Sequence, residues 1–303
     1  MIEPLNRKFQ RIIAKMIQNA AHAHTTINEN NVYQEGDPRN KAYMKEIIDE
    51  LMLPGSQLIG FENLVELYNL AQKGKKCLML MEHYSNFDIP CFYTLMWREG
   101  EMGKKVADSI VSVAGMKLNE ESALVRSFTE IFTRVVIFPK SGLKNIKDPE
   151  ELENAMERRK KINIAALKKL FELRTSGRLI LVFPTGTRYR PWDPTTGRGQ
   201  KEIDSYIKSY DYMVFIAING NTLKPNPNGN MDEDIPERDI MIYTISKVYN
   251  CREYRRNAIS SDENIRDVKQ HVVDTVMRDL KYLHRETEIK RKKLLKELEA
   301  KVH

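Results

Sequence analysis

The chain has few cysteines for its 303 residues: Cys77, Cys91 and Cys251, with no spacing typical of a metal site. A small, odd number of thiols indicates a reducing compartment rather than a disulfide-stabilised secreted domain. No apolar run approaches the roughly 20 residues that cross a bilayer. The first eight residues also lack the apolar core of a secretory signal. We therefore expect a cytoplasmic protein, with peripheral binding to the inner membrane surface as a further expectation.

An excess of one charge sign is present but modest. The chain has 49 Lys and Arg against 42 Asp and Glu, which gives a net charge of +7. This balance favours acidic partners, such as phosphorylated metabolites, acidic carrier proteins or anionic lipid surfaces. No zinc-finger spacing, RNA-binding signature or basic region joined to a zipper occurs, so nucleic acid is not an expected partner.

Apolar strand-like runs alternate with helical patterns along most of the chain. This alternation predicts an α/β fold with a mostly parallel central sheet flanked by helices. The predicted strands are Cys77–Met81, Ser109–Ala114, Arg134–Phe138, Leu179–Phe183, Tyr212–Ile218 and Ile240–Tyr249. The predicted helices between them are Phe61–Gln72, Ile89–Trp97 and Glu150–Arg174. We divide the chain into a small N-terminal helical segment (1–54), an α/β domain (55–260) and a basic C-terminal helical extension (261–303).

Three further segments have their own predictions. Leu5–Ala21 has an amphipathic pattern, typical of a helix that packs on the core or lies on a membrane surface. Asn219–Pro236, rich in Asn, Pro and Gly, is expected to be a loop. Asp262–His303 is expected to form one or two long helices. Its basic cluster Lys290–Lys293 is either solvated or in contact with anionic lipid headgroups.

The most informative pair of residues is His83 and Asp88. A histidine directly follows the apolar strand, and a carboxylate stands five positions later, where a second apolar stretch begins. A histidine at this place can take a proton from an alcohol, because imidazole titrates near neutral pH. The carboxylate can accept the other ring N–H, fix the tautomer and stabilise the imidazolium.

A cationic segment follows the predicted strand Leu179–Phe183. Pro184, Gly186 and Thr187 predict a turn, after which Arg188 and Arg190 point to the same side of an extended segment. Two guanidinium groups so placed can hold a dianionic phosphate. Alternatively, they are surface arginines paired with acids such as Asp193 or Asp204. Lys140 and Lys144, after the strand Arg134–Phe138, add further candidate cations at another strand end.

Together, His83-x4-Asp88 and Phe183-Pro184-x-Gly186-Thr187-Arg188 resemble the paired signature of the glycerolipid acyltransferases. The resemblance runs from about residue 55 to 225. It is strongest to the soluble chloroplast-type glycerol-3-phosphate acyltransferase, which has Arg-x-Arg-Pro where this chain has Arg188–Pro191. Thr185 favours that branch, which has Ser there, whereas most of the family has Glu. The basic pair of that branch corresponds to Leu143 and Lys144, so one of its two cations is retained.

The resemblance implies transfer of a fatty acyl group from acyl carrier protein or coenzyme A to the sn-1 hydroxyl of glycerol-3-phosphate. His83 would be the base and Asp88 its orienting group, while Arg188, Arg190 and Lys144 would hold the phosphate. Backbone N–H groups after His83 or near Gly186 would face the oxyanion. Neither a cofactor nor a metal is implied. A monoacylglycerol-3-phosphate acceptor is the near alternative, and a non-catalytic phospholipid-binding protein is the alternative of another class.

Overall fold

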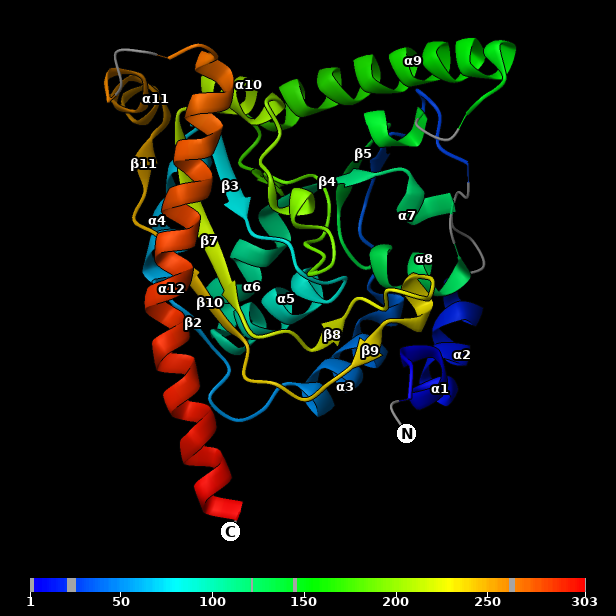
Figure 1. The fold of residues 1–303 in the computed structure, drawn as a ribbon, viewed down its shortest axis with the longest axis vertical. Coiled ribbons are helices and arrows are strands. Elements are labelled where there is room, and N and C mark those ends of the chain that lie inside the picture. Colours follow the sequence, from blue (N-terminus) through cyan, green and yellow to red (C-terminus); the bar gives the residue numbers. More distant parts are fainter. Residues whose placement is uncertain (1–2, 21–25, 121, 144–145, 262–264, 303) are drawn as a thin grey trace.

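In the computed structural model, the described residues are 3–20, 26–120, 122–143, 146–261 and 265–302. Within them, a nine-stranded sheet has the order β1-β5-β4-β6-β3-β7-β10-β2, and β11 also pairs with β7. The α/β class and the mostly parallel sheet are confirmed, although the sheet is mixed. Strand β3 is parallel to both neighbours, whereas β1–β5, β7–β10 and β7–β11 are antiparallel pairs. Figure 1 shows helices on both sides of this sheet.

The strands of the main sheet are β1 (Tyr33–Gln34), β2 (Gln57–Ile59), β3 (Cys77–Met81), β4 (Ile110–Gly115), β5 (Arg134–Ile137), β6 (Leu179–Val182), β7 (Tyr212–Asn219), β10 (Ile242–Ile245) and β11 (Tyr249–Asn250). Every residue of β3 and β6 is buried, as expected for central parallel strands covered on both faces. The C-terminal ends of β3, β4, β5 and β6 therefore share one edge of the sheet.

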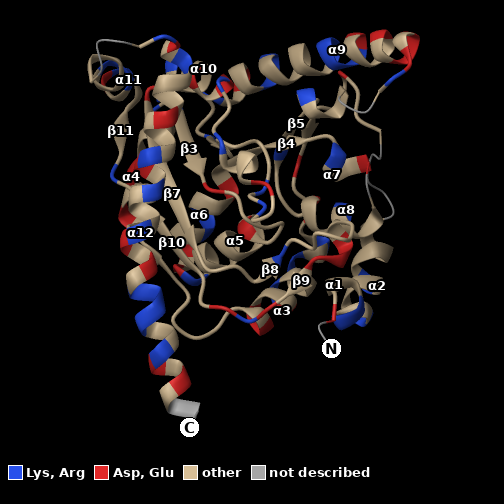
Figure 2. Ribbon diagram, viewed as in Figure 1, with Lys and Arg blue, Asp and Glu red and all other residues tan. Residues whose placement is uncertain are grey.

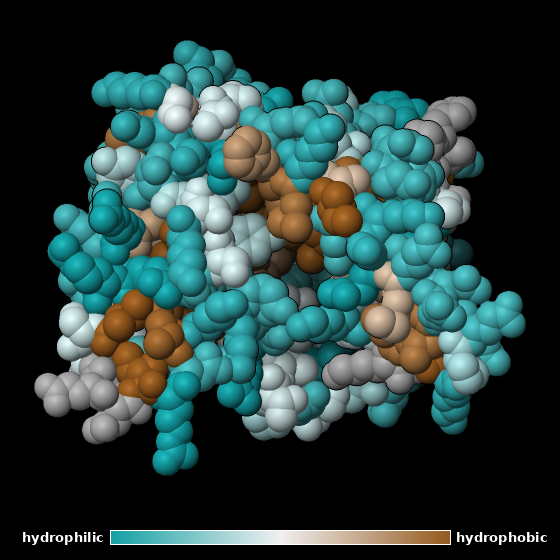
Figure 3. All heavy atoms as spheres, turned by 90° about the horizontal axis from the view of Figure 1, so that it is seen from above, coloured by the Kyte–Doolittle hydropathy of each residue, from teal (hydrophilic) through white to brown (hydrophobic). Residues whose placement is uncertain are grey.

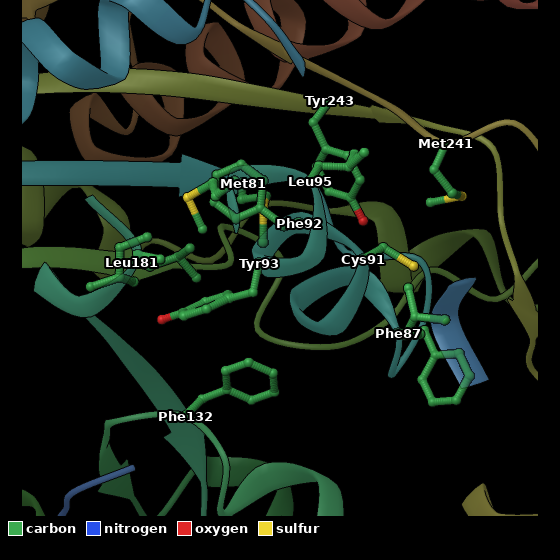
Figure 4. Packing of buried hydrophobic residues seen from close by; sticks show 14 of the residues in the cluster. Met81, Phe87, Cys91, Phe92, Tyr93, Leu95, Phe132, Leu181, Met241 and Tyr243 are labelled. Carbon is green, nitrogen blue, oxygen red and sulfur yellow. The ribbon is translucent and has the colours of Figure 1, made fainter. Parts of the chain in front are cut away.

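One face of the sheet packs against the N-terminal helices and the helices that follow β2, β3 and β4. These are α1 (Leu5–Lys8), α2 (Gln10–Asn19), α3 (Lys41–Leu51), α4 (Phe61–Gln72), α5 (Asp88–Arg98), α6 (Gly100–Ser109) and α8 (Ala123–Thr129). The short helix α7 (Lys117–Glu120) contacts α8. In Figure 4, side chains of α5 lie between the sheet and neighbouring aromatic rings. The rings of Tyr93 and Phe132 are 4.5 Å apart, and those of Phe92 and Tyr243 are 5.3 Å apart.

The other face is covered by helices from the second half of the chain. These are α9 (Pro149–Leu173), α10 (Glu202–Ser209), α11 (Cys251–Ser260) and α12 (Val268–Val302). The first turns of α12 are part of this core, since Val272, Val273, Val276 and Leu280 are fully buried. Figure 1 shows that α12 runs along the sheet and that its carboxyl end projects beyond it.

The amphipathic N-terminal segment packs on the core, which was the first of its two predicted roles. Leu5, Phe9, Ile13 and Met16 are all buried against the first core. The helix is divided at Phe9, whose φ of −110° and ψ of 25° separate α1 from α2. The predicted last residue, Ala21, lies outside the described residues.

Several predicted boundaries were wrong. The segment 240–249 holds two strands, because the chain leaves the sheet between β10 and β11. The predicted loop 219–236 includes a small antiparallel pair, β8 (Leu223–Lys224) with β9 (Ile235–Pro236). Helices α6, α7, α8, α10 and α11 were not predicted at all. Within the described residues, no helix has both the length and the apolar composition needed to span a bilayer.

Candidate active site

The predicted histidine and carboxylate meet directly after the central strand. β3 ends at Met81, six residues turn away from the sheet, and α5 begins at Asp88. His83 Nδ1 lies 2.9 Å from Asp88 Oδ2. The start of a helix also stabilises a carboxylate, because the first peptide dipoles point their positive ends toward it. The spacing of five residues therefore places both groups at the carboxyl edge of the sheet, as predicted.

The hydrogen bonds of the Asp88 carboxylate determine the tautomer of the His83 ring. Oδ2 also accepts the backbone N–H groups of Tyr84 at 2.6 Å and Ser85 at 2.9 Å, and the residue is 1% exposed. A buried carboxylate oxygen that accepts two N–H donors favours the tautomer in which His83 Nδ1 is a third donor. That tautomer leaves a lone pair on His83 Nε2, and no described residue hydrogen-bonds this nitrogen.

The histidine ring is also held by stacking. The rings of His83 and Phe183 are 4.0 Å apart at an interplanar angle of 15°. Phe183 directly follows β6, the parallel neighbour of β3, so the two rings project from adjacent strand ends. The His83 side chain is 18% exposed, which keeps the ring largely desolvated but accessible on one side. This stacking partner was not identified from the sequence as part of the site.

The second segment folds back onto the first. Gly186 has a φ of +65°, which a residue with a side chain rarely adopts, and its N–H donates to the Phe183 carbonyl. The Thr185 hydroxyl donates to the Thr187 carbonyl and closes the turn from inside. Pro184, Gly186 and Thr187 therefore form the predicted turn. Beyond it, the Tyr189 N–H donates to the His83 carbonyl oxygen at 2.8 Å, so the two sequence motifs are directly connected.

Arg188 has a partner that was not predicted. It is 8% exposed, and its guanidinium forms an ion pair with the buried carboxylate of Asp234 rather than with Asp193 or Asp204. Asp234 is in turn held by N–H groups, since Oδ1 accepts from Asn226 and the backbone carbonyl accepts from Leu5. The alternative prediction, a surface arginine paired with Asp193 or Asp204, was therefore wrong for Arg188. A bound phosphate would compete with a carboxylate for this guanidinium.

The other predicted cations are dispersed. The Arg190 guanidinium is partly buried and pairs with no described residue, while its backbone N–H donates to Thr196 Oγ1. Lys140 is exposed and pairs with Glu202 at 3.1 Å. Lys144 lies outside the described residues. Of the four predicted cations, the structure thus places Arg188 and Arg190 on the segment that contacts His83.

An apolar cavity adjoins the histidine. It contains about 830 Å³ of empty space, part of it open to solvent. His83 and Phe183 line it together with apolar side chains of α8 and its surroundings, including Leu124, Val125 and Phe128. A cavity with a mainly apolar lining and a few polar groups is typical of a small-molecule site. This cavity could not be located from the sequence, because its walls come from α5, β4, α8 and the N-terminus.

Two buried polar residues also line the cavity. Ser112 and Arg134, each 3% exposed, line it from neighbouring register positions on β4 and β5. Ser112 pairs with Leu181 of β6, which in turn pairs with Met79 of β3. Met79 precedes His83 by four residues, so Ser112 and His83 are about 13 Å apart along the strand direction. Burial lowers the pKa of Arg134 to about 10, although the charge of Glu130 opposes this. The cavity is therefore elongated.

Most backbone donors predicted for an oxyanion are engaged elsewhere. The N–H groups of Tyr84 and Ser85 are bonded to Asp88, and that of Gly186 is bonded to Phe183. Asn86, which was not considered from the sequence, lines the cavity beside His83. Its side-chain amide carries two N–H donors.

A third group of residues links the site to α12. The Glu82 carboxylate accepts the Tyr84 hydroxyl at 3.0 Å, the Ile218 N–H at 2.8 Å and His284 Nδ1 at 2.9 Å. Desolvation opposes protonation of His284, but the hydrogen bond and charge of Glu82 outweigh it, so the pKa of His284 is raised. Residues on both sides of His83 are thereby attached to the C-terminal helix.

The cysteines do not take part in this site. Burial raises the pKa of Cys91 to about 12, and its sulfur lies 3.4 Å from Thr222 Oγ1. A thiol in that state is a poor nucleophile. In the described part of the chain, no group of three or more His, Cys, Asp or Glu side chains is arranged to hold a metal ion.

Comparison with known proteins adds no identification: no protein-family model matches this sequence, and no curated protein matches it significantly.

Proposed function

We propose that this protein is an acyltransferase that moves a fatty acyl group from a thioester to the sn-1 hydroxyl of glycerol-3-phosphate. One observation carries the proposal: an imidazole whose Nδ1 is held by a buried carboxylate has its Nε2 unbonded beside an elongated apolar cavity. A base and an apolar site in contact are what acyl transfer to an alcohol requires.

The reaction follows from this arrangement. His83 Nε2 takes the proton of the acceptor hydroxyl while the hydroxyl oxygen attacks the thioester carbonyl carbon. The tetrahedral intermediate carries its charge on the former carbonyl oxygen, for which Asn86 is the nearby donor. Cleavage of the carbon–sulfur bond then gives the ester, and the imidazolium returns the proton to the leaving thiolate. Asp88 stabilises the imidazolium between these two transfers.

The apolar cavity is evidence for a long acyl chain as the transferred group. The two arginines of segment 188–190 are evidence for an anionic acceptor. Arg190 is the cation without a described partner, and Arg188 could exchange Asp234 for a phosphate. Because Tyr189 is hydrogen-bonded to the His83 carbonyl, a phosphate on either guanidinium would bring the attached glycerol close to the base. Such positioning can contribute several kcal/mol to rate enhancement. Acyl carrier protein and coenzyme A thioesters both suit the basic surface.

The test offers the purified protein glycerol-3-phosphate, its monoacyl form or free glycerol, each with an acyl–carrier protein and an acyl-coenzyme A donor. We expect transfer to glycerol-3-phosphate and little to free glycerol. Preference for the monoacyl acceptor would shift the assignment to the later acylation. Vesicle binding without transfer from any donor would favour the non-catalytic phospholipid-binding alternative, which does not need the ordered tautomer of His83.

A further inference from the structure

Helix α12 presents two different faces along its last six turns. The inner face is fixed to the sheet: Thr287 Oγ1 lies 2.8 Å from Thr244 Oγ1, and Arg291 pairs with Asp239 and bonds the Ile240 carbonyl. The outer face is consequently also fixed, and it points into solvent. Arg291 therefore does not belong to an exposed basic cluster, although the sequence grouped it with Lys290, Lys292 and Lys293.

The outer face forms a basic stripe with apolar side chains in its middle. Its members recur every three or four residues, which places them on one side of the helix. We define the α12 stripe as Arg278, Lys281, Tyr282, Arg285, Ile289, Lys292, Lys293 and Lys296. Tyr282 is 64% exposed and Ile289 is 75% exposed. The only exposed carboxylate within the described span 278–296 is that of Glu286.

The cations of the stripe are largely uncompensated. Arg278 lies 3.5 Å from Asp279, and Lys293 lies 4.0 Å from Glu297, while the other four pair with no described residue. From residue 278 to 296 the stripe extends for about 27 Å along a single straight element. In Figure 2, Lys and Arg recur along α12 and are densest toward its carboxyl end.

A second exposed apolar surface provides a contrast. On α9, Ile164 and Leu167 are 59% and 64% exposed, and Phe171 is 63% exposed. Lys161 pairs with Glu157 and Lys169 with Glu172, whereas Lys160 and Lys168 pair with no described residue. Figure 3 views the molecule from the end where α9 lies and shows apolar patches separated by hydrophilic side chains. Apolar exposure alone therefore does not distinguish α12, which differs in having four stripe cations that pair with no described residue, against Lys160 and Lys168 on α9.

We infer that the α12 stripe is a docking surface for an anionic lipid membrane. Basic residues attract the negative surface of the bilayer, and an exposed aliphatic and an aromatic side chain between them can enter the headgroup layer. A long convex stripe fits a flat, deformable surface better than it fits a folded acidic partner. This inference does not depend on acyl transfer, because vesicle binding can be measured without any substrate.

The experiment is flotation of the full chain with neutral phosphatidylcholine vesicles and with vesicles that also contain phosphatidylglycerol. We expect binding only to the anionic vesicles, with affinity that falls as salt is added. The triple variant Arg285→Glu, Lys292→Glu, Lys296→Glu should bind at least about tenfold more weakly. The matched control, Lys160→Glu, Lys161→Glu, Lys168→Glu, reverses the same number of exposed charges on α9 and should bind like wild type.

A second measurement leaves the charges unchanged. Ile289→Trp should shift its fluorescence to shorter wavelength with anionic vesicles, whereas Phe171→Trp on α9 should not. Equal binding to neutral vesicles, wild-type affinity of the α12 triple variant, or loss of binding in the α9 control would overturn the inference. So would failure to bind vesicles combined with capture of acyl carrier protein through the same residues.

Discussion

The backbone N–H of Tyr189 donates a hydrogen bond of 2.8 Å to the carbonyl oxygen of His83. This bond joins the segment that holds the base to the segment that holds two arginines, although more than a hundred residues separate them in the chain. Stacking of Phe183 on the His83 ring reinforces the connection. The segment that carries the two arginines therefore lies against the segment of the base, while His83 and Phe183 both line the apolar cavity.

The Asp88→Asn variant tests the orienting role of the carboxylate. An amide oxygen can still accept the N–H groups of Tyr84 and Ser85, but it does not stabilise the imidazolium formed during transfer. We expect kcat to fall by about 100-fold to 10,000-fold while KM for glycerol-3-phosphate changes little. Steady-state kinetics measures this, with thermal unfolding as the check on the fold. A kcat within twofold of wild type would show that Asp88 is only structural.

The Arg188–Asp234 pair requires a double variant. Replacing Arg188 alone removes the counter-charge of a buried carboxylate, so Arg188→Met should lower the free energy of unfolding by about 3–5 kcal/mol. Adding Asp234→Leu should restore most of that loss.

The stabilised double variant then isolates the contribution of Arg188 to phosphate binding. We expect KM for glycerol-3-phosphate to rise at least about tenfold, a loss typical of one charge-assisted contact, with little change in the slow reaction of free glycerol. An unchanged preference for the phosphorylated acceptor would assign Arg188 to folding alone.

The cavity makes a prediction about chain length. Ala114 lines it from β4, between His83 and the buried Ser112. Ala114→Phe should occupy part of the space and shift the preference toward shorter acyl thioesters, at a cost in stability of about 1–3 kcal/mol from overpacking. Competition among saturated acyl donors of increasing length measures this. The same preference in the variant and the wild type would mean that the chain binds elsewhere.

The contact between His284 and Glu82 predicts a pH-dependent stability. The pKa of His284 is raised in the folded state, so its contribution is complete below the ordinary value of 6.5 and is lost as pH rises through the folded value. Urea unfolding at about pH 6 and about pH 8 should therefore show a larger decrease for wild type than for His284→Gln. Equal decreases would contradict this contribution.

Glu130 must be controlled in that comparison. Burial raises its pKa to about 7, so its ionisation also destabilises the folded state as pH rises. In a Glu130→Gln background, the difference between wild-type His284 and His284→Gln should persist. Its disappearance would assign the pH dependence to Glu130 instead.

The sheet and the His83–Asp88 pair could be predicted because their signals are local. Five consecutive apolar residues form β3, and the spacing to Asp88 is set by one turn and the start of a helix. Gly186 likewise predicts a turn from the sequence, because glycine readily adopts the positive φ that the structure shows at this position. Each of these features depends on residues close together in sequence.

The remainder of the site depends on long-range packing. Asp234 reaches Arg188 from a loop whose Asn, Pro and Gly content predicts only irregular structure. The cavity combines residues from the N-terminus to Asp232, so no single window of sequence contains it. Arg291 turns inward because Asp239 lies beneath it, which a basic run alone does not reveal.

The most direct measurement is acyl transfer to glycerol-3-phosphate by wild type and His83→Ala, with His271→Ala as a histidine control on α12. We expect turnover by wild type and the control, and a loss of at least about 100-fold in a His83→Ala protein that unfolds cooperatively like wild type. Transfer by His83→Ala at the wild-type rate would contradict the assignment of His83 as the base.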